Sequence, residues 1–207
     1  MPRKNSRPRC PTCGLHLELC LCDALPLRDL PTAFVVVQHN RERTKPTSTG
    51  RVAAAVLRAP VVYYGARDEA MDTAPLDDPD LDYYVLFPSE GAPAVGAASM
   101  PVTPGKRRCV VVLDGTWHQC SRMARRAPRI SELPHRTLPP GPPSRWGVRT
   151  PPRPDAVCTF EAATRVVELL HGPAEAEPMS AFFAELTARM LAMRGRFPGE
   201  LDEADDE

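Results

Sequence analysis

The chain has 207 residues, a length that fits one domain with a small appendage and argues against two full domains. Its 26 lysines and arginines match 26 acidic residues, so the formal net charge is zero, although the two signs are unevenly distributed. The chain opens on polar and basic residues, and no apolar run approaches the roughly 20 residues needed to cross a bilayer. We therefore expect a cytoplasmic protein that does not enter a membrane.

Four of the seven cysteines lie close together near the start of the chain: Cys10, Cys13, Cys20 and Cys22. This Cys-x2-Cys-x6-Cys-x-Cys spacing lets four thiolates converge tetrahedrally on one zinc ion, and four protein ligands leave no open position for catalysis. We predict that residues 1–28 form a basic N-terminus and a structural zinc knuckle. Free thiols or a redox pair are the alternatives, and His16 could replace one ligand.

Apolar runs and helical patterns alternate along the rest of the chain, which is typical of an α/β fold with a mostly parallel sheet and helices on both faces. The first predicted helix follows a cap at Ser48 or Thr49, and the second begins near Thr116 and stops before Pro128. The predicted strands are Ala33–Gln38, Val61–Tyr64, Tyr83–Phe87 and Cys109–Leu113.

The most informative segment follows the last of these strands and reads Asp114, Gly115, Thr116 and Trp117. It places an acid at the carboxyl end of a buried strand, where parallel sheets commonly present reactive groups. Gly115 would permit an unusual turn, and Thr116 could cap the helix that begins with Trp117. Trp117 could stack on a base or serve as an ordinary packing residue.

Positive charge is concentrated around this segment, because residues 101–153 contain eleven lysines and arginines against two acidic residues. Cations that flank a reactive edge suit an anionic substrate such as RNA, whose phosphates give a salt-dependent affinity. The alternative is a solvated face of an arginine-rich protein. The candidate RNA-binding residues are Arg122, Arg125, Arg126 and Arg145.

The last third of the chain begins with a proline-rich segment, residues 139–154, which we interpret as a functional lid or an RNA-contacting loop. Thr159 can cap a third helix, and Met179–Met193 has the apolar spacing of a helix that closes the core. We expect residues 29–195 to form the α/β catalytic domain and residues 196–207 to form an acidic, disordered tail.

The spacing Asp-x-Thr-Trp resembles the signature of the DTW domain family, and other landmarks that resemble the family's occur in the same order. These landmarks are the cysteine cluster, His39, Glu42, Thr47–Gly50, Leu86–Ala92, Asp114–Trp117, Arg149 and Cys158–Ala162. The resemblance covers residues 10–172. Cys158 stands where the family more often has serine, which argues against a hydroxyl-dependent role at that position.

The resemblance implies a tRNA-uridine aminocarboxypropyltransferase, an enzyme that moves the 3-amino-3-carboxypropyl group of S-adenosyl-L-methionine to uridine N3 and releases methylthioadenosine. It also implies a SPOUT-like fold, a class in which knotted C-terminal loops form the S-adenosylmethionine site. The partner would then be tRNA, and Zn²⁺ would be a structural ion.

The same resemblance implies which residues form the site. The catalytic residues would be Asp114, Thr116 and Trp117. The residues that bind S-adenosylmethionine would be Ser89, Glu90, Gly91, Ala92, Leu113, Gly115, Arg149, Thr159 and Glu161. Asp114 would act as general base or would anchor the amino group of the transferred chain, and Arg149 could pair with its carboxylate. The glycine of the Ser-Glu-Gly-Ala loop would allow close backbone approach, whereas Thr159 and Glu161 also suit an ordinary helix N-terminus.

Two other classes of protein remain open at this point. A SPOUT-type RNA methyltransferase would share the fold and the substrate, because a fold does not determine a reaction. A non-catalytic zinc-knuckle RNA-binding protein would need the cysteines and the arginines but not Asp114. The product separates the first class from the transferase, and failure to bind S-adenosylmethionine identifies the second.

Overall fold

The computed structural model describes residues 7–151 and 153–195. Within them, a five-stranded sheet has the spatial order β2-β1-β4-β3-β5, and every neighbouring pair of strands is parallel. The strands are β1 (Ala33–His39), β2 (Val61–Tyr64), β3 (Leu81–Leu86), β4 (Arg107–Asp114) and β5 (His135–Arg136). The predicted parallel α/β class is confirmed, and the knot stays a prediction. The expected disordered tail, residues 196–207, lies outside the described residues.

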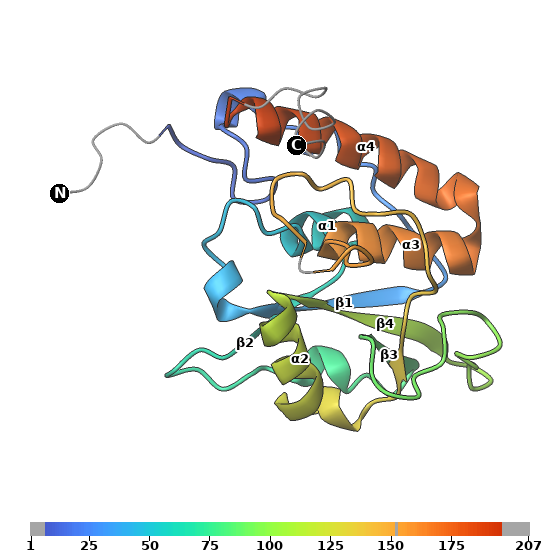
Figure 1. Cartoon of the computed structure of the whole chain (residues 1–207). Helices are drawn as coiled ribbons and strands as arrows, with labels where there is room; N and C mark the ends of the chain where they lie inside the picture. The colour runs from blue at the N-terminus through green and yellow to red at the C-terminus, as the bar shows by residue number, and fades with distance from the viewer. Residues whose placement is uncertain (1–6, 152, 196–207) are drawn as a thin grey trace.

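Helices cover both faces of this sheet (Figure 1). Three helices lie on one face, namely α1 (Gly50–Leu57), α3 (Thr159–His171) and α4 (Pro173–Ala192). On the other face lies α2 (Trp117–Arg126), which ends before Pro128 as predicted. Among the described residues, no helix is long and apolar enough to cross a membrane.

The two faces of β4 explain why its sequence is apolar throughout. Val110 and Val112 belong to the core that α1, α3 and α4 cover, whereas Cys109 and Val111 belong to the core that α2 covers. Side chains alternate between the faces of a strand, so a strand buried on both sides has no polar positions. This burial fixes β4, the central strand of the sheet, and thereby the position of Asp114 at its carboxyl end.

Two of the predicted helix starts are wrong. Cys158, whose backbone is extended, is the N-cap of α3, and Thr159 is the first residue of the helix. The Thr159 hydroxyl donates a hydrogen bond to Asp114. Helix α4 begins at Pro173, six residues earlier than predicted, since proline suits the first turn and Pro178 is accommodated inside the helix.

The N-terminal segment packs beside the carboxyl end of α4 (Figure 1). It contains two short 3-10 turns, η1 (Leu17–Leu19) and η2 (Cys22–Ala24). Cys13 and Leu15 are buried in the same core as α3 and α4. Arg189 of α4 donates a hydrogen bond of 3.1 Å from Nη1 to the carbonyl of Leu19. The cysteine cluster is therefore attached to the core of the sheet domain.

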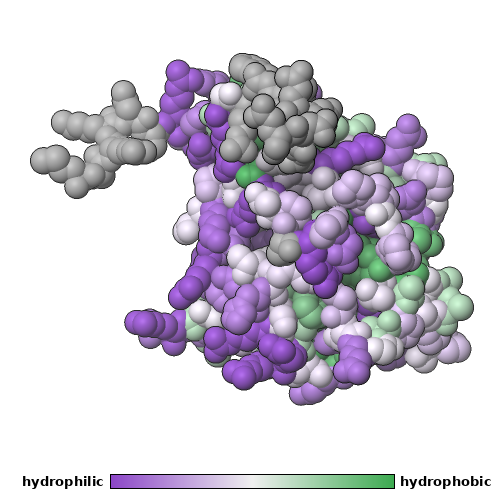
Figure 2. Space-filling view, in the orientation of Figure 1, coloured by the Kyte–Doolittle hydropathy of each residue, from purple (hydrophilic) through white to green (hydrophobic). Residues whose placement is uncertain are grey.

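A hydrophilic margin borders the carboxyl ends of β1 and β2. In Figure 2, hydrophilic residues gather along the left side of the molecule, over the turn η3 (Asn40–Glu42) and the loop that follows β2. Arg41, Arg43 and Arg67 are exposed in these two segments. Cationic residues therefore lie on the side of the sheet where parallel strands end.

Candidate active site

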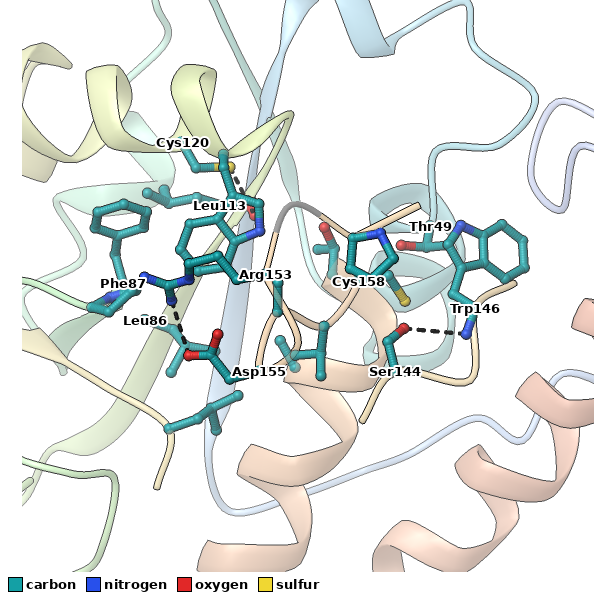
Figure 3. Close-up of a pocket in the computed structure, with 18 of the residues that line it drawn as sticks. Thr49, Leu86, Phe87, Leu113, Cys120, Ser144, Trp146, Arg153, Asp155 and Cys158 are labelled. Carbon is teal, nitrogen blue, oxygen red and sulfur yellow. Dashed lines mark hydrogen bonds and ion pairs between the residues drawn. The ribbon is translucent and has the colours of Figure 1, made fainter. Parts of the chain in front are cut away.

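A cavity of about 720 Å³ lies at the carboxyl ends of β3 and β4, within the size range of small-molecule sites. Its walls come from those strand ends, the first turn of α2, the loop before α3 and the start of α3 (Figure 3). The connections from the adjacent strands β1 and β4 lead toward opposite edges of the sheet. The cavity is lined by Thr47 and Thr49 after β1 and by Asp114 at the end of β4, so it borders a topological switch point. Parallel α/β proteins commonly bind ligands at such a point.

Asp114, the last residue of β4, lies in the wall of this cavity and is only 4% exposed. Its Oδ2 accepts hydrogen bonds of 2.7 Å from Gln38 Nε2 and from Ser48 Oγ. Its Oδ1 accepts a hydrogen bond of 2.6 Å from Thr159 Oγ1. These donors come from β1, from the loop before α1 and from the start of α3. The carboxylate joins the three segments and keeps one acceptor position on Oδ1 for a ligand.

Gly50 makes the close approach of α1 to Asp114 possible. A Cβ at position 50 would lie 2.6 Å from Asp114 Cβ and 2.7 Å from Asp114 Oδ2, which real carbon contacts do not permit. Neither Ser48 nor Thr49 caps α1 through its side chain, because Ser48 bonds Asp114 and Thr49 Oγ1 accepts from Phe160 N at 3.3 Å. Thr49 is thus the N-cap residue of α1, within the predicted pair, but its hydroxyl does not make the capping hydrogen bond.

We expect Gly50→Ala to lower the free energy of unfolding by about 1–3 kcal/mol, because overpacking displaces Asp114 and weakens its hydrogen bonds. Gly96→Ala is the matched control, since a Cβ there would meet only Ser99 Oγ, at 3.9 Å. Urea unfolding of both variants measures the difference. Equal free energies of unfolding for the two variants would show that position 50 is not sterically restricted.

Arg149 reaches the cavity wall from the proline-rich loop and is held there by buried Glu42. Arg149 Nη2 lies 2.8 Å from Glu42 Oε2, and Arg149 Nε donates to Thr47 Oγ1 at 2.9 Å. Glu42 is 1% exposed and also pairs with Lys45 at 2.5 Å. Burial raises the pKa of Glu42, but the hydrogen bonds and charges of Lys45 and Arg149 outweigh it and hold the pKa below its ordinary value. An ionised Glu42 therefore positions Arg149.

Trp117 begins α2 and lies between an aromatic ring and a cation. Its ring centroid is 6.0 Å from that of Phe87, and the Arg153 guanidinium lies 4.6 Å above the indole. Arg153 also pairs with Asp155 at 3.1 Å (Figure 3). One face of the indole is therefore occupied by a cation–π contact. A base that stacks on Trp117 from that face has to displace Arg153.

Thr116 and Gly115 shape the start of α2. Gln119 N donates to Thr116 Oγ1 at 3.3 Å, and Thr116 N donates to Gln119 Oε1 at 2.8 Å, which confirms the predicted cap as a capping box. The unusual turn predicted at Gly115 is wrong, because its φ is not positive. Glycine is favoured there by space, since a Cβ would lie 3.0 Å from Gln119 Cβ.

Glu161 accepts hydrogen bonds from the N-cap of α3 and from the loop before it. Its carboxylate accepts hydrogen bonds from Cys158 N at 3.0 Å, Ser144 Oγ at 2.6 Å and Arg145 N at 2.6 Å. Glu161 is not among the residues that line the cavity, whereas Thr159 and Leu113 are.

Burial raises the pKa of the Cys158 thiol well above its ordinary value, so this cavity residue stays a neutral thiol.

None of the residues of the Ser89–Ala92 loop lines the cavity. In this part of the chain, the cavity wall contains Leu86, the last residue of β3, and the next two residues, Phe87 and Pro88. Ser89 Oγ lies 2.5 Å from His135 Nδ1, and a Cβ at Gly91 would meet no atom within 4 Å. The cavity forms without this loop, and the cofactor contact expected of it stays a prediction.

The four N-terminal cysteines converge as their spacing predicts. Their Sγ atoms all lie within 4.8 Å of one another, with 3.4 Å between Cys10 and Cys22 and 3.7 Å between Cys13 and Cys20. Sulfurs bound tetrahedrally at about 2.3 Å from zinc would stand about 3.8 Å apart, so these side chains fit one ion. His16 does not belong to the cluster.

Comparisons with known proteins identify relatives of this chain. The model of the DTW domain family matches residues 7–191. Over 126 residues the chain is 31% identical to tRNA-uridine aminocarboxypropyltransferase 2 of Mus musculus, an alignment that covers 55% of this chain and 40% of that protein. Over 180 residues it is 26% identical to tRNA-uridine aminocarboxypropyltransferase 2 of Drosophila melanogaster, covering 83% of this chain and 70% of that protein. The chain thus spans less than half of the mouse relative. No solved structure gives a significant match.

Proposed function

Because this chain belongs to the DTW domain family, we propose that it transfers the 3-amino-3-carboxypropyl group of S-adenosylmethionine to N3 of a uridine in tRNA. The names of the mouse and fruit-fly relatives support the proposal. The observation that carries it is the cavity at the end of β4, whose wall contains all four residues of the segment Asp114–Trp117.

The side chains around this cavity fit S-adenosylmethionine. Leu86, Val112 and Leu138 provide apolar surface for an adenine ring. Asp114 offers an anionic acceptor for an ammonium group, and Arg149 offers a cation for a carboxylate. When bound, S-adenosylmethionine supplies a sulfonium leaving group and an electrophilic γ-carbon, so methylthioadenosine is the expected by-product.

Asp114 and Arg149 would together determine which group of S-adenosylmethionine is transferred. Asp114 anchors the amino group, because Thr159, Ser48 and Gln38 leave one acceptor position on its carboxylate. Arg149 is fixed by Glu42 at the same wall and attracts the carboxylate. The amino and carboxylate groups share one carbon at the end of the aminocarboxypropyl chain that is remote from sulfur. Holding both groups fixes that end and orients the γ-carbon, rather than the methyl group, toward uridine.

Two further parts of the chain have roles in this proposal. The cysteine cluster within residues 1–28 holds one structural zinc ion, and residues 29–195 form the catalytic domain. Exposed arginines on α2 and before α3 bind the phosphates of tRNA. These arginines are Arg122, Arg125, Arg126 and Arg145.

We expect the double substitution Arg122→Gln and Arg126→Gln to weaken tRNA binding and to lower the slope of log affinity against log salt concentration by about two. The reason is that each exposed guanidinium would neutralise one phosphate. Fluorescence anisotropy with labelled tRNA at several salt concentrations measures both quantities. Lys106→Gln is the control, because Lys106 lies just before β4, at the opposite end of the strand from Asp114. An unchanged slope in the double variant would contradict this RNA-binding role.

The proposed reaction is tested by incubating the protein with S-adenosylmethionine and unmodified tRNA, followed by mass spectrometry of nucleosides and small molecules. We expect aminocarboxypropyluridine together with methylthioadenosine. A methylated nucleoside with adenosylhomocysteine would instead indicate an RNA methyltransferase. Retained tRNA binding without S-adenosylmethionine binding would indicate a non-catalytic RNA-binding protein.

A further inference from the structure

Tyr63, in β2, is an aromatic residue that packs in neither core of the fold. Its ring is half-buried, and among the described residues it belongs to neither hydrophobic cluster, whereas its neighbour Tyr64 packs on the core that α2 covers. The guanidinium of Arg43 lies over the ring, with 4.6 Å between Arg43 Cζ and the ring centroid. The two side chains therefore form a cation–π pair at the surface rather than a part of the core.

Arg43 and Arg41 are cations without an acidic partner. Both are exposed, and neither guanidinium forms an ion pair or a hydrogen bond with any residue that the structure describes. Glu42, the acid between them, is buried and pairs with Lys45 and Arg149 instead. The two exposed guanidinium groups therefore present their positive charge to the solvent.

Strand register places Tyr63 near the candidate active site. Asp114 of β4 stands opposite Gln38 of β1, and Gln38 stands opposite Tyr63 of β2. Neighbouring strands lie about 4.8 Å apart, so about 10 Å separates the backbones of Tyr63 and Asp114. The loop that contains Arg43 continues to Thr47, which lines the cavity. An RNA strand that delivers a base to Asp114 can therefore contact Tyr63 within a few nucleotides.

The proposed reaction requires an unpaired uridine. N3 carries the hydrogen that uridine donates in a base pair, so N3 can react only when that pair is absent. Enzymes that modify a base accordingly act on single-stranded segments or on a base turned out of a helix. Single-stranded RNA is recognised by aromatic rings and guanidinium planes on which its bases stack, together with cations that contact its phosphates.

We propose that Arg43 and Tyr63 form a stacking platform for an unpaired nucleotide that flanks the target uridine in tRNA, and that Arg41 binds the adjoining phosphate. The inference rests on the proposed function. The tyrosine ring holds the guanidinium of Arg43 in place without neutralising it, so the charge and the plane of that group are both available to RNA. Arg41 lies two residues earlier, in η3, and supplies the second positive charge.

Electrostatics link this platform to the arginines proposed on α2. Burial lowers the pKa of His39, at the end of β1, and the positive charges of Arg41 and Arg122 lower it further. Arg41 lies in η3 and Arg122 lies on α2, so the charges of both segments act on one imidazole ring. The proposed RNA-binding surface therefore continues from α2 across the end of β1 to β2.

The test measures the affinity of labelled unmodified tRNA for Tyr63→Leu and Arg43→Lys variants at several salt concentrations. Leucine keeps the apolar bulk and lysine keeps the charge, so each substitution removes only a stacking surface. We expect each to weaken tRNA binding about tenfold without changing the salt slope. Tyr63→Phe, which keeps the ring, should bind tRNA as the unsubstituted protein does. Arg41→Gln should lower the salt slope by about one.

Arg58→Lys is the matched control for Arg43→Lys. Arg58 is also exposed, but it is the C-cap of α1 and precedes the first residue of β2, so it lies at the opposite end of that strand from Tyr63. Its substitution should leave the affinity for tRNA unchanged. The affinity for S-adenosylmethionine and the unfolding temperature should stay as in the unsubstituted protein for every variant, because Tyr63 belongs to neither core.

The outcomes separate this inference from the proposed function. If Tyr63→Leu and Arg43→Lys bind tRNA with the affinity of the control, the platform does not bind RNA, whatever the product of the reaction. If they lose affinity as expected but the unsubstituted protein forms no aminocarboxypropyluridine, the platform stands and the proposed reaction fails. A short RNA duplex without unpaired bases serves as a second probe, and the two variants should bind it as the unsubstituted protein does. An equal loss of affinity for duplex and tRNA would overturn the assignment to an unpaired nucleotide.

Discussion

Asp114→Asn should weaken the binding of S-adenosylmethionine by about ten- to a hundredfold, because the ammonium group loses a charge-assisted hydrogen bond. The substituted amide also has to present an NH₂ group where the carboxylate now accepts from Gln38, Ser48 and Thr159. At one of these contacts two hydrogen-bond donors then oppose each other, which should lower the free energy of unfolding by about 1–2 kcal/mol. Isothermal titration calorimetry measures the binding and urea unfolding measures the stability.

Asp155→Asn provides the control for this experiment. Asp155 lines the same cavity, but it is exposed and pairs only with Arg153 among the interactions described for it. We expect its substitution to leave the affinity for S-adenosylmethionine within a few-fold of the original, because exposed ion pairs contribute little. If Asp114→Asn binds S-adenosylmethionine normally yet forms no product, the anchoring role is wrong and Asp114 is better assigned as the general base.

Removing the metal from the cysteine cluster should produce the largest loss of stability. We expect Cys13→Ser, or incubation with a zinc chelator, to lower the unfolding temperature by about 10 °C or more. Cys13 is 2% exposed, and Leu15 beside it is fully buried in the core that α3 and α4 share. If the cluster holds a zinc ion, its loss would therefore uncover the main core rather than a detached appendage.

Thermal unfolding followed by circular dichroism, together with elemental analysis for one zinc per chain, measures this effect. Cys158→Ser is the matched control, because Cys158 lies outside the cluster and serine is the stronger residue at a helix N-cap. Its unfolding temperature should be equal or slightly higher. Purified protein that contains no metal and unfolds at the same temperature with and without chelator would contradict the zinc assignment.

Several features of the fold were predictable because their causes are local. The apolar run that ends at Asp114 indicates a strand buried on both faces, and Thr116 with Gln119 forms a capping box three residues apart. The cysteine spacing likewise brings four sulfurs together within one short segment. By contrast, β5 has only two residues, too few for any hydrophobic period to mark it.

The errors at the starts of α1 and α3 have one physical cause. Thr159 has the chemistry of a cap, and Ser48 and Thr49 precede a helix as caps do, but each hydroxyl has a tertiary partner instead. A hydroxyl that can complete a buried network contributes more there than at a solvated helix end. A sequence pattern shows that a hydroxyl can cap the neighbouring helix. It does not show a hydrogen-bond partner that is distant in the chain.

The sequence by itself determined the parallel α/β class, the convergence of the four cysteines and the position of Asp114 at a strand end, because each depends on neighbouring residues or on burial along one strand. Only the tertiary structure decided what surrounds that carboxylate. Its donors lie 76, 66 and 45 residues away in the chain, and the Glu42–Arg149 pair joins residues 107 apart. Such contacts depend on strand order and on how α1 and α3 pack, which no local pattern encodes.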